Sequence, residues 1–384
     1  MVILCTKVRL LELSRQAYLV LEDGSWYEGE AFGAETSSFG EVVFNTSMTG
    51  YQEVLTDPSY SGQIVIPTYP IIGNYGINGE DMESKRIQVA GFAVREHSLR
   101  PSHSLSTMTV HEYLASEGIT GISGIDTRAI TRKLRMSGVM MGMIAVETTP
   151  QEALAQIGKI TPYDNVDFVA SVSTKTSYPW DGFVPEENGP LILVSDYGLK
   201  YNILRILQSS GCRVMAMPVS ASASDILSLK PDGILLSPGP GDPALLDYVV
   251  ETAKGLVGHV PIMGICLGHQ IIARAFGGST FKLKFGHRGA NHPVREIQTN
   301  RVYITAQNHG YAVDADSLPS ELEVSHINLN DNTVEGIRHK ELPIMSIQYH
   351  SEASPGPLDN IYLFDKFLEM VGFSIEGNSK RKQP

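Results

Sequence analysis

The sequence predicts an α/β protein with a central, mostly parallel sheet in its C-terminal domain and a separate N-terminal mixed α/β domain. Three observations lead to this prediction. The chain has 384 residues, a length typical of two domains. Residues 173–190 are rich in proline, glycine and polar residues without an apolar period, as expected of an inter-domain linker. After this linker, short apolar runs alternate with amphipathic stretches, the pattern of βαβ units.

The N-terminal domain is expected to span residues 1–172. Residues 17–33 (AYLVLEDGSWYEGEAFG) predict a β-hairpin with Asp23-Gly24 at its turn. Further short strands, separated by glycine and proline turns, are expected up to about residue 95. Two amphipathic stretches then predict helices over 106–118 and 126–138.

The C-terminal domain is expected to span residues 191–375, followed by a polar and disordered tail over 376–384. Its first part alternates strands with helices, and the segment from about 302 to 349 is rich in strands. A last helix is expected over 360–371. The predicted strands of the alternating part are 191–195, 213–219, 232–237 and 260–265, and its predicted helices are 199–211, 222–230, 244–258 and a helix directly after Cys266.

Composition excludes several classes of function. The formal net charge is −12, which argues against nucleic-acid binding because phosphates require a positive surface. The N-terminal apolar stretch is interrupted by charged residues, so the sequence predicts neither a signal peptide nor a membrane span. The three cysteines, Cys5, Cys212 and Cys266, are too few for a disulfide framework, and a reducing, cytoplasmic location is expected.

Cys266 is the first candidate for chemistry. It stands between two glycines in the stretch PIMGICLGHQ, at a predicted turn from strand to helix. A Gly-x-Cys-x-Gly turn of this kind is a nucleophile elbow, which projects its central side chain above the carboxyl edge of the sheet. The partial positive charge at the helix N-terminus favours a thiolate there. The alternative is an inert buried cysteine in a glycine-rich turn.

A thiolate nucleophile requires a base, and the base requires a group that orients it. The stretch IMSIQYHSEASPGP contains an apolar strand followed by His350 and Glu352. In an extended segment, residues i and i+2 point to the same side, so Glu352 can accept a hydrogen bond from the imidazole. A solvated His-x-Glu at the end of a strand is the alternative interpretation.

The stretch LLSPGPGDP (235–243) is a third candidate. A Gly-Pro-Gly sequence directly after a strand exposes backbone N–H groups that suit an oxyanion, although it also fits a turn stiffened by proline. The chain contains neither a Walker-type phosphate loop nor a Gly-x-Gly-x-x-Gly motif. Its histidines show no close metal-ligand spacing, so no metal and no cofactor are expected in this chain.

Four motifs together resemble a known family. The stretches GICLGHQ, SPGPGDP, NHGY (308–311) and HSEASPGP are similar to the class I, triad-type glutamine amidotransferases, which are flavodoxin-like α/β domains. In the N-terminal half, GEVVFNTSMTGYQEVLTDPSYSGQIV, YPIIGNYGIN and GIDTRAITRKLR resemble the small subunit of carbamoyl-phosphate synthetase. The resemblance runs from about Ala17 to Val371.

The resemblance implies a role for each matching residue. Cys266 is expected to attack the glutamine amide and form a glutamyl thioester, while His350 transfers protons and Glu352 orients His350. The implied oxyanion N–H groups belong to Gly239 and Leu267. The implied glutamine-binding residues are Ser47, Gly241, Gln270, Asn308, Gly310 and Tyr311.

The resemblance also implies a partner. Ammonia is expected to pass through a tunnel to a separate large subunit, where ATP and magnesium bind and where bicarbonate is converted into carbamoyl phosphate for pyrimidines and arginine. The sequence departs from the family at Ser351, where proline is common, at Pro238, where asparagine is frequent, and at Tyr311, where phenylalanine is frequent. None of these changes removes a catalytic group. An amidotransferase subunit of another synthase and a non-catalytic scaffolding subunit remain the alternatives.

Overall fold

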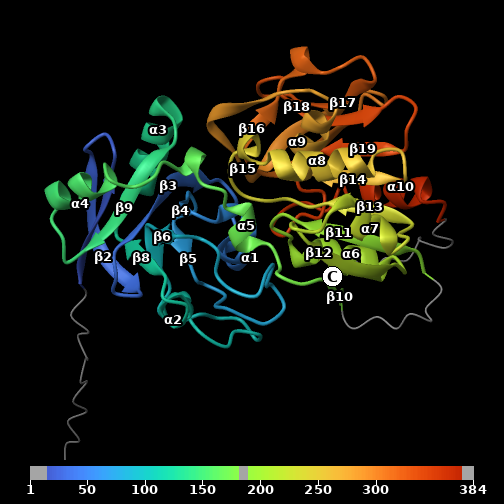
Figure 1. Ribbon diagram of the computed structural model, residues 1–384. Coiled ribbons are helices and arrows are strands. Elements are labelled where there is room, and N and C mark those ends of the chain that lie inside the picture. Colours follow the sequence, from blue (N-terminus) through green and yellow to red (C-terminus); the bar gives the residue numbers. More distant parts are fainter. Residues whose placement is uncertain (1–14, 181–188, 374–384) are drawn as a thin grey trace, which may run out of the picture.

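The computed structural model describes residues 15–180 and 189–373. Figure 1 shows two bodies side by side, the N-terminal half in blue to green and the C-terminal half in yellow to red. The predicted α/β class is therefore confirmed. The predicted tail, residues 376–384, lies outside the described residues.

The N-terminal half is built on a closed barrel of seven strands in the order β1-β2-β8-β6-β4-β3-β9, in which β9 pairs with β1. The predicted hairpin over 17–33 is confirmed as β1 and β2, and the N–H of Leu21 bonds to the carbonyl of Ser25 across its turn at 2.8 Å. Closure was not predicted, because it depends on pairing between strands that are far apart in sequence. The barrel strands are β1 Gln16–Leu21, β2 Trp26–Gly33, β3 Ser38–Asn45, β4 Gln63–Pro67, β6 Gly91–Ala93, β8 Thr120–Ser123 and β9 Met140–Val146; β5 Ile71–Ile72 and β7 Glu96–His97 pair separately.

Helices with strong local start signals surround the barrel. Both predicted helices are confirmed, and the second begins at an Asp126 cap and ends before Gly138. Capping boxes at Thr109 and Thr149 explain why the first predicted helix begins at Val110 and why another helix begins at Pro150. The elements are α1 Tyr51–Thr56, η1 Pro58–Tyr60, α2 Val110–Ser116, α3 Thr127–Ser137, α4 Pro150–Ile157, η2 Tyr163–Asn165 and α5 Val169–Val172.

The C-terminal half is built on a ten-stranded sheet in the order β10-β12-β11-β13-β14-β19-β18-β17-β15-β16. Five adjacent strands, β12-β11-β13-β14-β19, are parallel and follow the flavodoxin-like order 2-1-3-4-5. The remaining strands pair antiparallel. The strands are β10 Tyr178–Pro179, β11 Leu191–Asp196, β12 Arg213–Pro218, β13 Gly233–Leu236, β14 Ile262–Ile265, β15 Thr280–Glu296, β16 Val302–Val313, β17 Leu322–Asn328, β18 Val334–His339 and β19 Ile344–Ile347.

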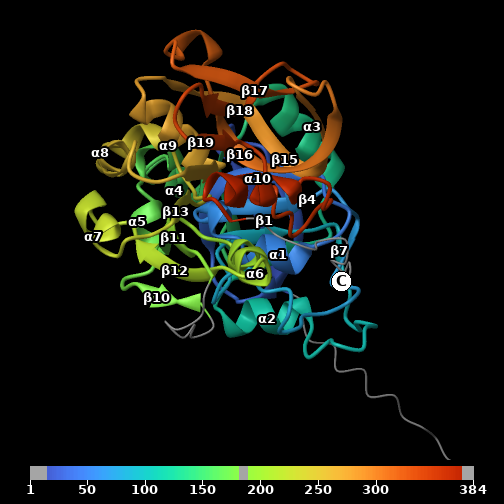
Figure 2. The ribbon, with the colours of Figure 1, turned by 90° about the vertical axis from the view of Figure 1, so that its right-hand side faces the viewer.

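Helices cover both faces of this sheet and bury its alternating apolar side chains. Leu193 and Ile234 pack towards α7, α8 and α9, whereas Ile192 and Val194 pack towards α6 and α10. Figure 2 shows α7 and α6 on opposite sides of β11 to β13. The helices are α6 Tyr201–Ser209, α7 Ala223–Ser228, α8 Asp247–Leu256, α9 Leu267–Ala275 and α10 Tyr362–Met370, with short turns η4 Pro243–Leu245 and η5 Ala315–Ser317.

Two features of the C-terminal half were not predicted. The segment 280–296 is a long strand, β15, which pairs with β16 and reaches the barrel, where the N–H of Thr46 donates to the carbonyl of Arg288 at 3.1 Å. Its two register irregularities explain why it lacks a clean alternation of apolar residues. Within the expected linker, Tyr178–Pro179 forms β10 against β12, while residues 181–188 lie outside the described part of the chain.

Candidate active site

The turn at Cys266 has the geometry of a nucleophile elbow. Cys266 lies between the end of β14 and the first residue of α9, and its φ of 53° falls in the left-handed region. Its N–H donates to the carbonyl of Ile347 in β19 at 2.8 Å, which fixes the strained residue at the carboxyl edge of the sheet. The side chain is buried, and its Sγ lies 3.6 Å from the carbonyl oxygen of Asn308.

The two glycines on either side of Cys266 allow close approach of backbone to backbone. A Cβ on Gly268 would lie 2.1 Å from the carbonyl oxygen of Leu236 in β13. A Cβ on Gly264 would lie 2.7 Å from the carbonyl carbon of Gly268. Helix α9 therefore begins in contact with β13 and β14 only because both positions lack a side chain.

His350 and Glu352 lie at the same edge of the sheet as Cys266. They follow β19, which pairs in parallel with β14, so both strands end at the same edge. The His350 Nδ1 and Glu352 Oε1 atoms are 2.6 Å apart, and the N–H of His350 donates to the carbonyl of Ala306 at 2.9 Å. The structure thus brings together the predicted pair and places it at the same edge of the sheet as Cys266.

The charges around His350 favour an imidazolium. Burial is the largest influence and opposes the charge of His350, but the charge of Glu352 and its hydrogen bond with the ring help to raise the pKa of His350 to about 10. Burial likewise opposes ionisation of Glu352, but Lys200 and His350 lower the pKa of this carboxyl to about 2. At neutral pH the orienting pair is therefore a buried carboxylate beside a protonated ring.

Lys200 and Asn202 hold the loop that carries Glu352, and sequence reasoning missed both. Lys200 Nζ lies 3.2 Å from Glu352 Oε1 and also donates to the carbonyl of Ala353. The side-chain amide of Asn202 donates to the carbonyl of Glu352 at 2.6 Å. The available signal was a lysine directly before an apolar helix, at the position where a serine, threonine or aspartate cap is usual.

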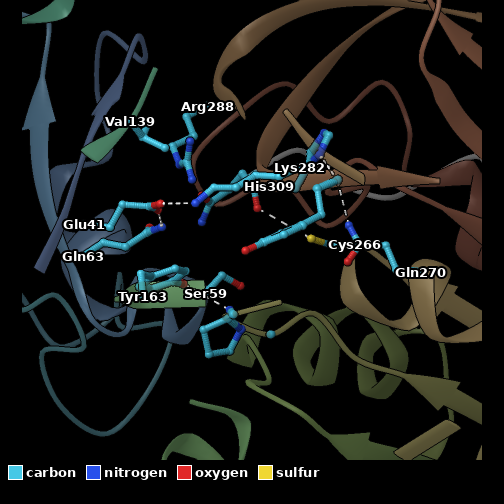
Figure 3. Close-up of a pocket in the computed structure, with 16 residues that line it drawn as sticks. Glu41, Ser59, Gln63, Val139, Tyr163, Cys266, Gln270, Lys282, Arg288 and His309 are labelled. Carbon is cyan, nitrogen blue, oxygen red and sulfur yellow. Dashed lines mark hydrogen bonds and ion pairs between the residues drawn. The ribbon is translucent and has the colours of Figure 1, made fainter. Parts of the chain in front are cut away.

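A pocket opens in front of Cys266, between the barrel and the C-terminal half. Figure 3 shows Cys266 and Gln270 on one side of it and Glu41 and Gln63 of the barrel on the other. The pocket is lined by seven of the predicted site residues, namely Gly239, Gly241, Cys266, Gln270, Asn308, Gly310 and Tyr311. The structure therefore gathers most of the predicted set around one cavity.

Hydrogen bonds hold the polar side chains of this pocket in place. The amide nitrogen of Gln270 donates to the carbonyl of Tyr311 at 2.9 Å, and the hydroxyl of Tyr311 donates to Asp164 at 2.7 Å. The amide nitrogen of Asn308 donates to Asp57 Oδ2 at 3.0 Å. Asp57 and Asp164 belong to the N-terminal half, so that half positions two residues of the pocket.

The glycines after β13 lie against the start of α9. A Cβ on Gly239 would lie 2.7 Å from a methyl carbon of Leu267 and 2.3 Å from the carbonyl oxygen of Tyr197. The first residue of α9 is Leu267, next to Cys266, and its side chain is buried outside the lining of the pocket. The N–H of Gly241 donates to the hydroxyl of Tyr163 at 3.1 Å.

Ser47 does not line the pocket in front of Cys266, but it shares a second cavity with two other predicted residues, His350 and Asn308. It lines this second cavity, on the barrel side of His350, together with Asp57 and Lys200. Its N–H donates to the side-chain oxygen of Asn45 at 2.6 Å. Among the residues of this second cavity, Asn308 also lines the pocket at Cys266, so the two cavities meet at this side chain.

The pocket also contains charged residues that sequence reasoning did not identify. Lys282 Nζ lies 2.8 Å from Glu41 Oε1 and 2.5 Å from Asp164 Oδ1, so this cation of β15 joins the barrel to the sheet. Burial opposes its charge, but Glu41 and Asp164 raise the pKa of Lys282. Arg288 lines the same pocket, with Nη1 donating to the carbonyl of Phe285 at 2.8 Å.

His309 lines the pocket and belongs to a buried group with His287 and Glu335, in which the nitrogen and oxygen atoms able to bind a metal lie within 4.8 Å of one another. Hydrogen bonds already join these residues to their neighbours: His287 Nε2 lies 2.8 Å from Asp331 Oδ2, and His309 Nδ1 lies 2.7 Å from the carbonyl of Tyr311. The group therefore forms a polar network that extends from the wall of the pocket.

Among the described helices, none has the length and apolar character needed to cross a membrane.

Comparison with known proteins identifies two family matches and several close relatives. Residues 193–370 match the family Glutamine amidotransferase class-I, and residues 19–144 match the family Carbamoyl-phosphate synthase small chain, CPSase domain. The chain is 49% identical to the carbamoyl phosphate synthase small chain of Solidesulfovibrio magneticus over 369 residues, which cover 93% of this chain and 98% of that protein. It is 51% identical to the small chain of Staphylococcus epidermidis (92% and 95% covered) and 49% identical to that of Aquifex aeolicus (94% and 100% covered).

Proposed function

Because this chain belongs to the family of carbamoyl phosphate synthase small chains, we propose that it hydrolyses glutamine at Cys266 and delivers the ammonia to a large synthetase subunit. The observation that carries this proposal is the arrangement of three residues. Cys266 occupies a strained elbow beside the 2.6 Å His350–Glu352 pair, at one edge of one sheet.

The first half of the reaction transfers the glutamyl group to sulfur. The Cys266 thiolate attacks the side-chain amide carbon, and a C–S bond forms while the carbonyl oxygen becomes an oxyanion. The N–H groups of Gly239 and Leu267 are the proposed donors to this oxygen. The His350 imidazolium gives its proton to the amide nitrogen, the C–N bond breaks, and ammonia leaves.

The second half of the reaction regenerates the thiol. His350, now neutral, takes a proton from water as the water attacks the thioester carbon, and the C–S bond then breaks to release glutamate. Glu352 keeps the ring in one orientation throughout, and its charge favours the imidazolium form. Gly241, Gln270, Asn308, Gly310 and Tyr311 are the proposed glutamine-binding residues at the pocket, with Ser47 contributing from the adjoining cavity.

Ammonia must leave without meeting bulk water if it is to be used elsewhere. The second cavity, which reaches His350 and Asn308 from the barrel side, is a suitable start for its path. The proposed acceptor is a large subunit that binds ATP and magnesium and uses bicarbonate. No cofactor is proposed for this chain, because thiolate chemistry on an amide requires none.

The decisive test is the substitution Cys266→Ser, assayed with the large subunit. We expect glutamine-dependent carbamoyl phosphate synthesis to fall by at least about 1,000-fold, because a hydroxyl beside the imidazolium is a much weaker nucleophile than a thiolate. Synthesis from added ammonium chloride should stay within about twofold of the unaltered complex. Glutamine use that persists in this variant would overturn the assignment of the nucleophile.

Two alternatives give different results in the same assays. A subunit of another synthase would hydrolyse glutamine but would not bind the carbamoyl phosphate large subunit in co-purification. A non-catalytic scaffold would bind the large subunit without any glutamine-dependent activity. The match of residues 19–144 to the carbamoyl phosphate synthase family disfavours the first alternative, and the intact Cys266, His350 and Glu352 disfavour the second.

A further inference from the structure

Helix α6, whose first turn supports the loop of Glu352, lacks a cap from its own sequence. Its N-cap residue is Lys200, whose side chain makes no capping hydrogen bond. Lysine has no acceptor atom, so it cannot satisfy the free N–H groups of the first turn. The lysine is instead committed to Glu352, 3.2 Å away.

The missing cap comes from the other half of the chain. Glu83, in the loop between β5 and β6 of the barrel half, is buried and accepts three hydrogen bonds from α6. Its carbonyl accepts the N–H of Tyr201, its Oε2 accepts the N–H of Asn202, and its Oε1 accepts Arg205 Nη1, each at 3.0 Å. Burial raises the pKa of Glu83 to about 7, while Lys200, the Asn202 N–H and Arg205 favour its ionised form, which complements the partial positive charge of the helix N-terminus.

Glu83 is itself fixed within the barrel half. Its N–H donates to the hydroxyl of Thr56 at 2.9 Å, and the hydroxyl of Ser84 donates to the carbonyl of Thr56 at 2.6 Å. Thr56 is the last residue of α1, which packs in the core of that half. The cap therefore transmits the position of the barrel half to the first turn of α6.

We propose that Glu83 is a positioning residue for glutamine hydrolysis, which caps α6 from the barrel half so that Lys200 and Asn202 hold Glu352 against His350. This inference rests on the proposed function. The role depends on a continuous series of contacts, which runs from Thr56 through Glu83 and the first turn of α6 to Glu352. Without the cap, the first turn frays, and both anchors of the Glu352 loop lose their fixed positions.

The test compares Glu83→Ala and the nearly isosteric Glu83→Gln with the control Glu80→Ala, all in the complex with the large subunit. The side chain of Glu80 is exposed in the same loop, and the one bond of Glu80 to α6, from Arg205 Nη2 to its carbonyl at 3.3 Å, uses the main chain that an alanine keeps. We expect kcat for glutamine hydrolysis to fall about 10- to 100-fold in Glu83→Ala, with KM changed less than about threefold, because a misplaced Glu352 affects the chemical step. The kcat of Glu83→Gln should lie between that of Glu83→Ala and that of the unaltered protein. The kcat of Glu80→Ala should match that of the unaltered protein.

A second measurement separates positioning from general damage to the fold. The rate at which iodoacetamide alkylates Cys266 reports the thiolate, which the His350 imidazolium stabilises. If Glu352 loses its position, that support weakens, so the acid limb of the alkylation profile should move to higher pH by about half a unit or more in Glu83→Ala. Global destabilisation without repositioning would leave this limb unchanged and would overturn the proposal.

Arg205→Ala distinguishes the cap from the ion pair. It removes the guanidinium bonds to Glu83 and to the carbonyls of Glu80 and Met82 but leaves the carboxylate on the Asn202 N–H, so we expect less than about a threefold loss of kcat. A loss equal to that of Glu83→Ala would overturn the capping role. An unaltered complex that fails to hydrolyse glutamine would refute the proposed function. Because alkylation needs no turnover, the pH profiles of Cys266 alkylation would still decide the role of Glu83.

Discussion

At the scale of single residues, the elbow shows how a glycine can be required by a neighbour rather than by its own dihedral angles. Gly268 lies in helix α9, where an alanine is normally the more stable residue. A Cβ on Gly268 would nevertheless lie only 2.1 Å from the carbonyl oxygen of Leu236, which leaves no room for a side chain. The steric requirement therefore reverses the usual helix preference.

We predict that Gly268→Ala destabilises the protein by about 1–3 kcal/mol, because helix and strand must separate to admit the methyl group. Cys266 would move with the helix, so glutaminase activity should fall at least about tenfold. Urea unfolding and steady-state glutaminase assays measure the two effects. Gly79→Ala is the control, since a Cβ there meets nothing within 4 Å; equal stability of the two variants would contradict the explanation.

At the scale of elements, β15 combines two tasks and carries a weak sequence signal. Its register shifts and its polar residues, among them His287 and Lys282, hide the alternation that marks an ordinary strand. By contrast, the parallel strands and their helices were predicted from sequence because burial on both faces leaves continuous apolar runs between amphipathic stretches. The elbow was predictable because its signal is local: Gly264 and Gly268 each lie only two residues from Cys266 in the chain.

The ion pair of His287 in β15 predicts a specific pH dependence. Burial opposes the charge of His287, but the neighbouring carboxylates of Asp331 and Glu335 raise its pKa to about 9. Burial also opposes ionisation of Asp331, but its bond to His287 lowers the pKa of Asp331 to about 2. The raised histidine stabilises the fold fully below pH 6.5 and loses this effect as pH rises through 9; the lowered aspartate stabilises it above pH 4 and loses the effect as pH falls towards 2.

We therefore expect Asp331→Asn to reduce the free energy of unfolding most between about pH 4 and 6.5, with a difference from the unaltered protein that shrinks as pH rises through 9. Urea unfolding at pH 5, 7.5 and 9.5 measures it. Asp316→Asn is the control, since that side chain makes no hydrogen bond among the described residues. A difference that stays constant over this range would contradict the assigned ionisation of His287.

At the scale of the whole molecule, the site is completed by contacts across the interface of the two halves. The sequence motifs identified the groups nearest to the reacting atoms, but not Asp57, Lys200 or Lys282, whose importance depends on partners more than 100 residues away. Such pairs follow no local pattern, so only the folded chain reveals them. The separate position of Ser47, in the adjoining cavity, is a further result that sequence reasoning could not supply.

One of these interface contacts yields a direct prediction. Asp57 Oδ1 caps η1 through the N–H of Ser59, while Oδ2 accepts the amide of Asn308 at 3.0 Å. Asp57→Asn keeps the bond from the Ser59 N–H. It also places the new amide nitrogen against that of Asn308, and two donors cannot hydrogen-bond to each other. We expect KM for glutamine to rise about tenfold, the equivalent of ~1.4 kcal/mol, with kcat changed less.

Steady-state kinetics of glutamine hydrolysis in the complex measure this change. Asp126→Asn is the matched control, because this aspartate caps α3 in the same half and is exposed. An unchanged KM in Asp57→Asn would mean that Asn308 does not depend on the barrel half for its position.

Because Glu83 caps α6 from the barrel half, the two halves cannot be exchanged between proteins independently. The gene reads as two modules joined at residues 173–190, and such modules are often exchanged by recombination. Here a transplanted C-terminal half would carry α6 with Lys200 as its N-cap but would lack the Glu83 carboxylate that accepts the N–H of Asn202. A functional chimaera must therefore also contain the loop around Glu83. The segments that must be exchanged together thus extend beyond the C-terminal domain that the sequence motifs define.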